Sequence, residues 1–463
     1  MSTKTYESTW QKENDQLLQY VLNKRLFEPL KFEDNSVHKS TAVELYVTPE
    51  CNLKCEYCYL YRYGDKLYPK ELRNHDTIIK NLEILCEHFI AEQYHIPELE
   101  IFSGEIWGSE FSDRLLGTLL HYIKNGLDVG FVMIPSNVTF LTSEKSTEFM
   151  QKYIDAYKAV GVRLAVSASI DGIVIEEMSR PHKDASKSGL RDQDYYDRVF
   201  EFCSKNSFGL HPMVSPQSVK YWIDNHEWFL EMMRKYKIDY SCGIMLLEVR
   251  NDEWTQENID DYLKFINYLV DKLRMNFYVS DEEMAQDVFR LKGGHLITNY
   301  NAIALANVGR SPGCTIHRTL HVRLGDLAIV PCHRLSYDAL NYGAYVVEND
   351  KIVGIKSNNV QMALRNYMTN IKATHHGCDA CPYNFFCIKG CFGAQLEATG
   401  DPYFPCSSVC NLEKQKIDFL IKKYTDIGLV AQLQKKVNSD TAARDVLENI
   451  NKLKAYKEGG ATR

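Results

Sequence analysis

The sequence predicts an α/β fold in which parallel strands alternate with helices and curve into a partial (β/α)6 barrel. Three observations support this expectation. Short apolar runs alternate with longer amphipathic stretches between residues 43 and 270, this strand–helix pair repeats six times, and polar turns follow several of the strands. Such repeats are typical of parallel sheets covered by helices. A chain of 463 residues is long enough for this body and a further domain.

Six apolar runs are expected to be strands, at residues 43–47, 98–102, 130–134, 162–169, 210–214 and 241–249. Amphipathic stretches between them predict helices, among them 76–93 and 112–126, and a last helix is expected over 413–437. The chain is expected to divide into five parts. They are an N-terminal helical extension (1–42), the partial barrel (43–270), a bridging segment (271–312), a cysteine-rich domain (313–412), and C-terminal helices with a tail (413–463).

The charge and the apolar content of the sequence bear on whether the protein binds nucleic acid or a membrane. The net charge of −7 offers no basic face for nucleic acid. The N-terminus lacks the apolar segment of a signal peptide, and no apolar run approaches the ~20 residues needed to span a bilayer. We therefore expect a cytoplasmic protein without a nucleic-acid or membrane partner. Thiols stay reduced in the cytosol, so the 14 cysteines need an explanation other than disulfides.

The cysteines are clustered. Cys86, Cys203 and Cys242 stand apart in apolar surroundings and are expected to be buried thiols. Three others fall in the stretch TPECNLKCEYCYLYR, and eight lie between residues 314 and 410. Eleven clustered thiols in a reducing compartment indicate metal binding.

The first cluster has one ligand fewer than a closed site requires. Cys51, Cys55 and Cys58 are spaced C-x3-C-x2-C, whereas a structural zinc takes four ligands and disulfides need an even count. A four-iron, four-sulfur cluster bound by three thiolates keeps one iron open for a small molecule. This loop follows the first expected strand, and the polar turns 103–108, 135–137 and 170–172 follow later ones. That edge of an α/β barrel is where active sites are built.

These motifs resemble the radical S-adenosylmethionine (SAM) superfamily, whose signature C-x3-C-x-(aromatic)-C matches Cys51, Cys55, Tyr57 and Cys58. The resemblance implies that these thiolates bind a [4Fe–4S] cluster whose open iron chelates SAM. Ser103 replaces the first glycine of the family's Gly-Gly-Glu. The residues that the resemblance implies for SAM binding are Gly104, Glu105, Ser136, Asn137, Ser169, Asp171 and Arg180. Reductive cleavage of SAM would yield a 5′-deoxyadenosyl radical that abstracts hydrogen; no catalytic acid or base is identified.

The C-terminal cysteine field is similar to the SPASM extension of radical enzymes that act on peptides. A zinc module is the alternative, because C-x2-C pairs are common in zinc sites. The resemblance implies two auxiliary [4Fe–4S] clusters, for three in all. Cys378, Cys381, Cys387 and Cys410 would ligate one, and Cys314, Cys332 and Cys391 the other. The second would then have an open iron or recruit Cys406 or His317.

The resemblance favours maturation of a ribosomally made precursor peptide, by a thioether or carbon–carbon crosslink or another modification. It also implies a flavodoxin- or ferredoxin-type electron donor. Because residues 1–42 are too few for a peptide-binding winged helix, a separate peptide-recognition protein is a further possible partner. Oxidation of a Cys or Ser in a protein, as by anaerobic sulfatase maturases, is an alternative, but His333 stands where those enzymes have an Asp. A non-catalytic iron–sulfur electron carrier is the alternative of another class.

Overall fold

The computed structural model describes residues 41–187, 189–291, 300–305, 316, 318–369, 377–378, 380–387 and 390–459. The chain divides into two compact units. The first unit consists of Met1–Ser169, Arg180–Phe202 and Cys314–Ala373, and the second of Ile170–Ser179, Cys203–Gly313 and Thr374–Arg463. Most of the expected N-terminal extension, Cys314, His317 and the side chain of Cys242 lie outside the description.

The first unit is built on one eight-stranded sheet with the strand order β12-β11-β10-β9-β1-β3-β5-β6. Its parallel half consists of β1 (Ala42–Thr48), β3 (Leu99–Ser103), β5 (Phe131–Ser136) and β6 (Arg163–Ala168). β9 (Thr319–Arg323) adds to β1 in parallel, and β10 (Ala328–Val330), β11 (Gly343–Glu348) and β12 (Lys351–Lys356) continue antiparallel. β2 (His95–Ile96) and β4 (Asp128–Val129) form a small second sheet. The first four predicted strands are thus present, within two residues of their expected bounds.

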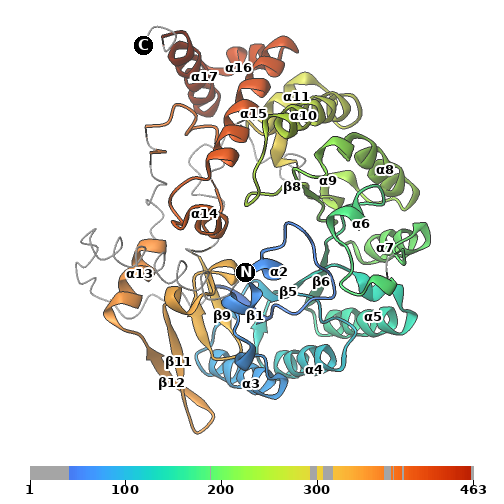
Figure 1. Cartoon of the computed structure of the whole chain (residues 1–463), viewed down its shortest axis with the longest axis vertical. Coiled ribbons are helices and arrows are strands. Elements are labelled where there is room, and N and C mark those ends of the chain that lie inside the picture. Colours follow the sequence, from blue (N-terminus) through green and yellow to red (C-terminus); the bar gives the residue numbers. More distant parts are fainter. Residues whose placement is uncertain are drawn as a thin grey trace, which may run out of the picture. The chain divides into compact units, whose positions relative to one another are not determined.

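Helices cover the parallel half of this sheet (Figure 1). They are α3 (His75–Ala91), α4 (Glu110–Lys124) and α5 (Glu144–Ala159), while α2 (Tyr59–Leu67) follows the cysteine loop. α4 begins earlier than its sequence predicts. Ser109 caps it, and Ser112, the first residue of the expected helix, is the third helical residue. The side chain of Ser112 accepts from the Ser109 N–H in a capping box. The unit also contains α13 (Asn359–Thr369) and the start of α7 (Gln193–Asn206).

The second unit is mainly helical. Its helices are α6 (Glu176–Ser179), α8 (Trp222–Lys235), α9 (Tyr240–Gly243), α10 (Gln256–Asn276), α11 (Asp281–Val288), α14 (Phe392–Thr399), α15 (Ser407–Asp426), α16 (Leu429–Lys436) and α17 (Thr441–Gly459). β7 (Met213–Val214) pairs in parallel with β8 (Leu247–Glu248) in a sheet of their own. None of the helices among the described residues is long and apolar enough to span a membrane.

Two expectations need correction in this unit. The run 241–249 is not one strand, because Tyr240–Gly243 is a short helix and only Leu247–Glu248 pair as β8. The last helix is interrupted at Gly428, which adopts φ +83° between α15 and α16. The fifth and sixth expected strands pair only with each other among the described residues, so a six-stranded barrel stays a prediction.

Candidate functional site

The three-cysteine loop leaves the end of β1 and runs closely over the turn that follows β3. The N–H of Gly104 donates to the carbonyl oxygen of Thr48 at 2.8 Å, and the N–H of Glu105 donates to that of Glu50 at 2.6 Å. A Cβ atom at residue 104 would lie 2.0 Å from the Glu50 carbonyl oxygen. Gly104 is therefore needed because two backbone segments meet there.

A second segment, residues 181–183, holds the same loop from its other side. The N–H of Lys54 donates to the carbonyl oxygen of Pro181, and the N–H of Lys183 donates to that of Asn52, both at 2.9 Å. Leu53 and His182 form an antiparallel bridge between these two bonds. Residues 181–183, which we call the strap, thus fix the backbone between Cys51 and Cys55.

The three thiols are half-buried, and the loop supplies donors suited to thiolates. The sulfur of Cys51 accepts from the N–H of Leu53 at 3.4 Å and from Nδ2 of Asn137 at 3.6 Å. Burial, with a smaller contribution from the charge of Glu105, raises the pKa of Cys51 to about 11. Cys58 is the N-cap residue of α2.

Glu105 meets both residues of the predicted Ser-Asn turn. Its carboxylate accepts from Oγ of Ser136 at 2.9 Å and from the N–H of Asn137 at 2.6 Å. Burial raises the pKa of Glu105 to about 8, although these hydrogen bonds and the charge of Arg180 oppose the shift. A cationic partner would stabilise the ionised form of this buried carboxyl. Asn137 therefore links Glu105, through its backbone, to Cys51, through its side chain.

A pocket of about 320 Å³ opens beside Glu105. Trp107 and Phe140 give it apolar walls, while Asn52, His182 and Arg191 contribute polar groups. Its size lies in the range of small-molecule sites. Arg180 is buried and lies near this pocket. Its charge partly opposes the rise in the pKa of both Glu105 and Cys51. Its carbonyl oxygen accepts a hydrogen bond from Nη2 of Arg191, which lines the pocket, at 2.7 Å.

Two residues beside the predicted set complete this network. Asn52 receives a hydrogen bond from Nδ2 of Asn137 at 2.8 Å and donates one to Oγ1 of Thr139 at 2.7 Å. Thr139 in turn donates to Oδ1 of Asn137 at 2.7 Å. The only sequence signal for these two was their position, directly after Cys51 and after the Ser-Asn turn.

The remaining predicted cofactor residues are Ser169 and Asp171. The N–H of Ser169 donates to the carbonyl oxygen of Ser136 at 2.7 Å, which places Ser169 at the end of β6 beside the Ser-Asn turn. Asp171 belongs to the second unit. Its buried carboxylate accepts from Oγ of Ser179 at 2.7 Å and from the N–H of Met213 at 2.9 Å. These contacts give Asp171 a structural role in its turn; its predicted role toward a cofactor stays a prediction.

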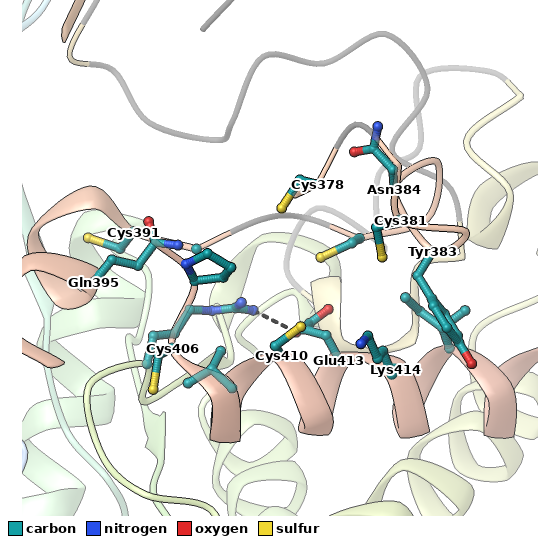
Figure 2. Close-up of a pocket in the computed structure, with 16 residues that line it drawn as sticks. Cys378, Cys381, Tyr383, Asn384, Cys391, Gln395, Cys406, Cys410, Glu413 and Lys414 are labelled. Carbon is teal, nitrogen blue, oxygen red and sulfur yellow. Dashed lines mark hydrogen bonds and ion pairs between the residues drawn. The ribbon is translucent and has the colours of Figure 1, made fainter. Parts of the chain in front are cut away.

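Six of the eight C-terminal cysteines line one pocket of the second unit (Figure 2). They are Cys378, Cys381, Cys387, Cys391, Cys406 and Cys410. Cys410 lies on α15, and Figure 2 shows it facing Cys378 and Cys381 on the loop above. Burial raises the pKa of Cys410. Cys391 and Cys406 therefore share a pocket with the four cysteines expected to ligate one cluster, and the division of ligands between clusters stays a prediction.

The turns of this pocket are ordered by backbone bonds between neighbouring cysteines. The N–H of Cys381 donates to the carbonyl oxygen of Cys378 at 3.1 Å, and that of Cys410 to Cys406 at 2.9 Å. Cys391 and Cys406 are the N-cap residues of α14 and α15. Within the described ranges, no three His, Cys, Asp or Glu side chains are grouped as ligands of one ion. The thiolates of a four-iron cluster bind different irons and need not share such a point.

Cys332 lies in the first unit and precedes a buried charge cluster. Nδ1 of His333 lies 2.8 Å from one carboxylate oxygen of Glu44, and Nδ1 of His321 lies 3.1 Å from the other. Burial opposes ionisation, but the two histidines hold the pKa of Glu44 well below its ordinary value. Glu44 and burial together raise the pKa of the neighbouring Glu100 to about 8. His333 also stacks on Phe102, with ring centroids 3.8 Å apart.

Comparison with known proteins gives matches among solved structures only. Neither a family model nor a curated protein matches the chain. Native anSMEcpe with bound AdoMet is similar at 16% identity and a TM-score of 0.49, covering 83% of this chain and 99% of that one. Streptococcus suis SuiB bound to precursor peptide SuiA is similar at 14% identity and a TM-score of 0.43, covering 80% of this chain and 76% of that one. At these values, neither neighbour assigns an activity or a ligand to this chain.

Proposed function

We propose that this chain is a radical SAM enzyme with auxiliary iron–sulfur clusters, and that it modifies a ribosomally made precursor peptide. The observation that carries the proposal is the link made by Asn137. This residue contacts Cys51 of the three-cysteine loop and also holds Glu105, the carboxylate expected to bind the SAM amino group. A metal loop and a cation-accepting carboxylate are thereby joined at one pocket.

The residues present fit the groups that the proposal requires. Cys51, Cys55 and Cys58 would hold a cluster with one iron open, and the N–H donors at Cys51 suit a ligating thiolate. When bound, the cluster would supply the electron for reductive cleavage of SAM, which would start hydrogen abstraction from the substrate. Glu105 would accept the SAM ammonium group, and the walls formed by Trp107 and Phe140 would exclude water from the reacting groups.

A purely electron-carrying protein would not need this arrangement. Such a carrier requires clusters and a path for electrons, whereas a half-buried carboxyl with a raised pKa beside a small-molecule pocket costs stability without serving electron transfer. The precursor peptide, an external flavodoxin- or ferredoxin-type donor and a separate peptide-recognition protein are the partners that we propose. A short Cys-rich or repeat-bearing gene next to the gene of this chain would identify the peptide.

The test is anaerobic incubation of the iron-loaded protein with a reductant and SAM. We expect 5′-deoxyadenosine to form, and we expect none when Cys51, Cys55 and Cys58 are all changed to Ala. Cys203→Ala is the matched control, because this buried thiol lies outside both cysteine clusters and its loss should leave cleavage intact. A reducible cluster at Cys51 without any 5′-deoxyadenosine would instead support the electron carrier.

A further inference from the structure

Below the C-terminal cysteine pocket lies a buried network of charged side chains in the second unit. Nη2 of Arg250 contacts Glu248 at 2.9 Å and Glu413 at 3.1 Å. Nζ of Lys416 contacts the same two carboxylates at 3.0 and 2.8 Å. The hydroxyl of Tyr262 donates to Glu248 at 2.5 Å. Two carboxylates and two cations are therefore held together by contacts from β8, α10 and α15.

Only one limb of the Arg250 guanidinium takes part in these contacts. Nη1 is buried and has no hydrogen-bond partner among the described residues. A buried donor of this kind loses its hydrogen bonds to water and gains none in return. The network fixes the guanidinium plane through Nη2, so Nη1 is held in a set direction without an acceptor.

Arg250 and the six cysteines line the same pocket, so a group bound by these thiols is a candidate acceptor for Nη1. Glu413 and Lys414 are the other charged residues of that lining. With Glu248 and Lys416 behind them, the wall carries three cations and two anions. Burial opposes the charge of Arg250, but Glu413, Glu248 and the thiolate of Cys387 hold its pKa above the ordinary value. The guanidinium charge of Arg250 therefore interacts with the charge of Cys387.

We propose that Arg250 is a positioning residue that donates a hydrogen bond from Nη1 to a sulfur of the cluster held by the cysteines of this pocket, and so raises the reduction potential of that cluster. The inference rests on the proposed function. Reduction adds one electron to the cluster, and the protein supplies no further proton in this step. Hydrogen bonds to sulfur and nearby positive charge favour the more negative, reduced state.

The pocket offers a matched control for charge alone. Lys414 lines the same wall, but its ammonium lies over the ring of Tyr383, 6.0 Å from the centroid, and is not fixed by the carboxylate network. Arg250→Gln removes a charge and the fixed donor, whereas Lys414→Gln removes an equal charge only. Arg250→Lys keeps the positive charge but replaces the forked guanidinium, including the Nη1 donor, with a single ammonium group.

The experiment is an EPR-monitored redox titration of the full chain in which Cys51, Cys55 and Cys58 are changed to Ala, so that the signals come from the C-terminal clusters. At a fixed potential, Arg250→Gln should lower the ratio of reduced to oxidised cluster about tenfold, which for one electron is a shift of about 59 mV to more negative potential. Arg250→Lys should give a smaller shift in the same direction. Lys414→Gln should shift the potential by less than a third of the Arg250→Gln effect.

Equal shifts in Arg250→Gln and Lys414→Gln, or no shift in an iron-loaded Arg250→Gln protein, would overturn the role of Arg250 while leaving the proposed function intact. If the Arg250→Gln protein does not retain iron, the test uses Arg250→Lys instead. A cluster reduction potential that is unchanged in Arg250→Lys would overturn the inference. A parent protein that binds zinc or no metal at this pocket contradicts the iron–sulfur part of the proposed function itself.

Discussion

Asn137 is the residue at which two separately predicted features become one site. Its backbone N–H and its side chain point to different partners, the carboxylate of Glu105 and the sulfur of Cys51. Loss of the side chain would leave the Glu105 bond in place and remove the contacts to the cysteine loop and to Thr139. The carboxylate and the metal loop are thus positioned by a single turn after β5.

The raised pKa of Glu105 makes a pH dependence of SAM binding predictable. With a pKa of about 8, most of this carboxyl is protonated at pH 6 to 7, and it must lose its proton to pair with an ammonium group. An α-amino group remains protonated over that range. SAM affinity of the anaerobic, iron-loaded protein, measured by calorimetry, should therefore rise about tenfold between pH 6 and pH 7. Glu105→Gln should bind more weakly and without this rise.

Thermal unfolding supplies the control for that variant. Because the folded pKa of Glu105 is raised above its unfolded value of 4.5, the neutral carboxyl stabilises the fold at low pH, and this contribution is lost as pH rises toward 8. The melting temperature of Glu105→Gln relative to the parent should consequently increase from pH 5 to pH 8. An affinity that is flat in pH for the parent protein would contradict the assignment of Glu105.

Residues that follow strands could be predicted as neighbours, whereas buried partners distant in sequence could not. Glu105, Ser136 and Asn137 meet because parallel strands end at one edge of the sheet. Glu44 and His333 are 289 positions apart. Glu44 stands out as an acidic residue within the apolar run 43–47. No local sequence pattern predicts that its partner is a histidine so distant in the sequence.

At the scale of elements, the strap pairs with the three-cysteine loop and holds its backbone. Its two backbone bonds flank the bridge between Leu53 and His182, so the loop between Cys51 and Cys55 is paired like a short strand. The strap carries no cysteine and matches no motif, so its role could not be predicted from the sequence.

Lys183→Pro tests the strap, since proline removes the N–H that donates to Asn52. A lost hydrogen bond of about 1 kcal/mol should make iron leave the N-terminal site roughly two- to tenfold faster in the presence of a chelator, measured by absorbance under anaerobic conditions. Lys183→Ala is the control, because it keeps the backbone donor and removes the side chain. Equal rates in both variants would show that the strap does not hold the metal loop.

Periodicity predicted the elements of the first unit better than those of the second. Strands such as β5 alternate buried and half-buried residues, which is the pattern of a covered sheet. The run 241–249 is mostly apolar and does not alternate, and such a run does not distinguish a strand from a buried helix turn. Its first part is helical in the structure and only its end pairs with β7.

For the whole molecule, the three-cysteine loop and the pocket of six cysteines belong to different units. The loop is part of the first unit, whereas the pocket is built within the second. Sequence spacing did not separate Cys332 from these six, although Cys332 belongs to the first unit. It could not predict that Cys391 and Cys406 line the same pocket as Cys378, Cys381, Cys387 and Cys410, because that depends on how α14 and α15 pack.

The placement of the three-cysteine loop and of the six-cysteine pocket in different units leads to a prediction about metal content. Each compact unit packs its own core, so loss of the N-terminal ligands should leave the pocket of the second unit intact. Iron and sulfide analysis of the anaerobic protein should give about twelve irons per chain, since each of three clusters holds four. Changing Cys51, Cys55 and Cys58 to Ala should lower the count to about eight, and Cys203→Ala should leave it at about twelve. About four irons in the parent protein would exclude both auxiliary clusters, and a count in the triple variant far below eight would mean that the two sites do not load independently.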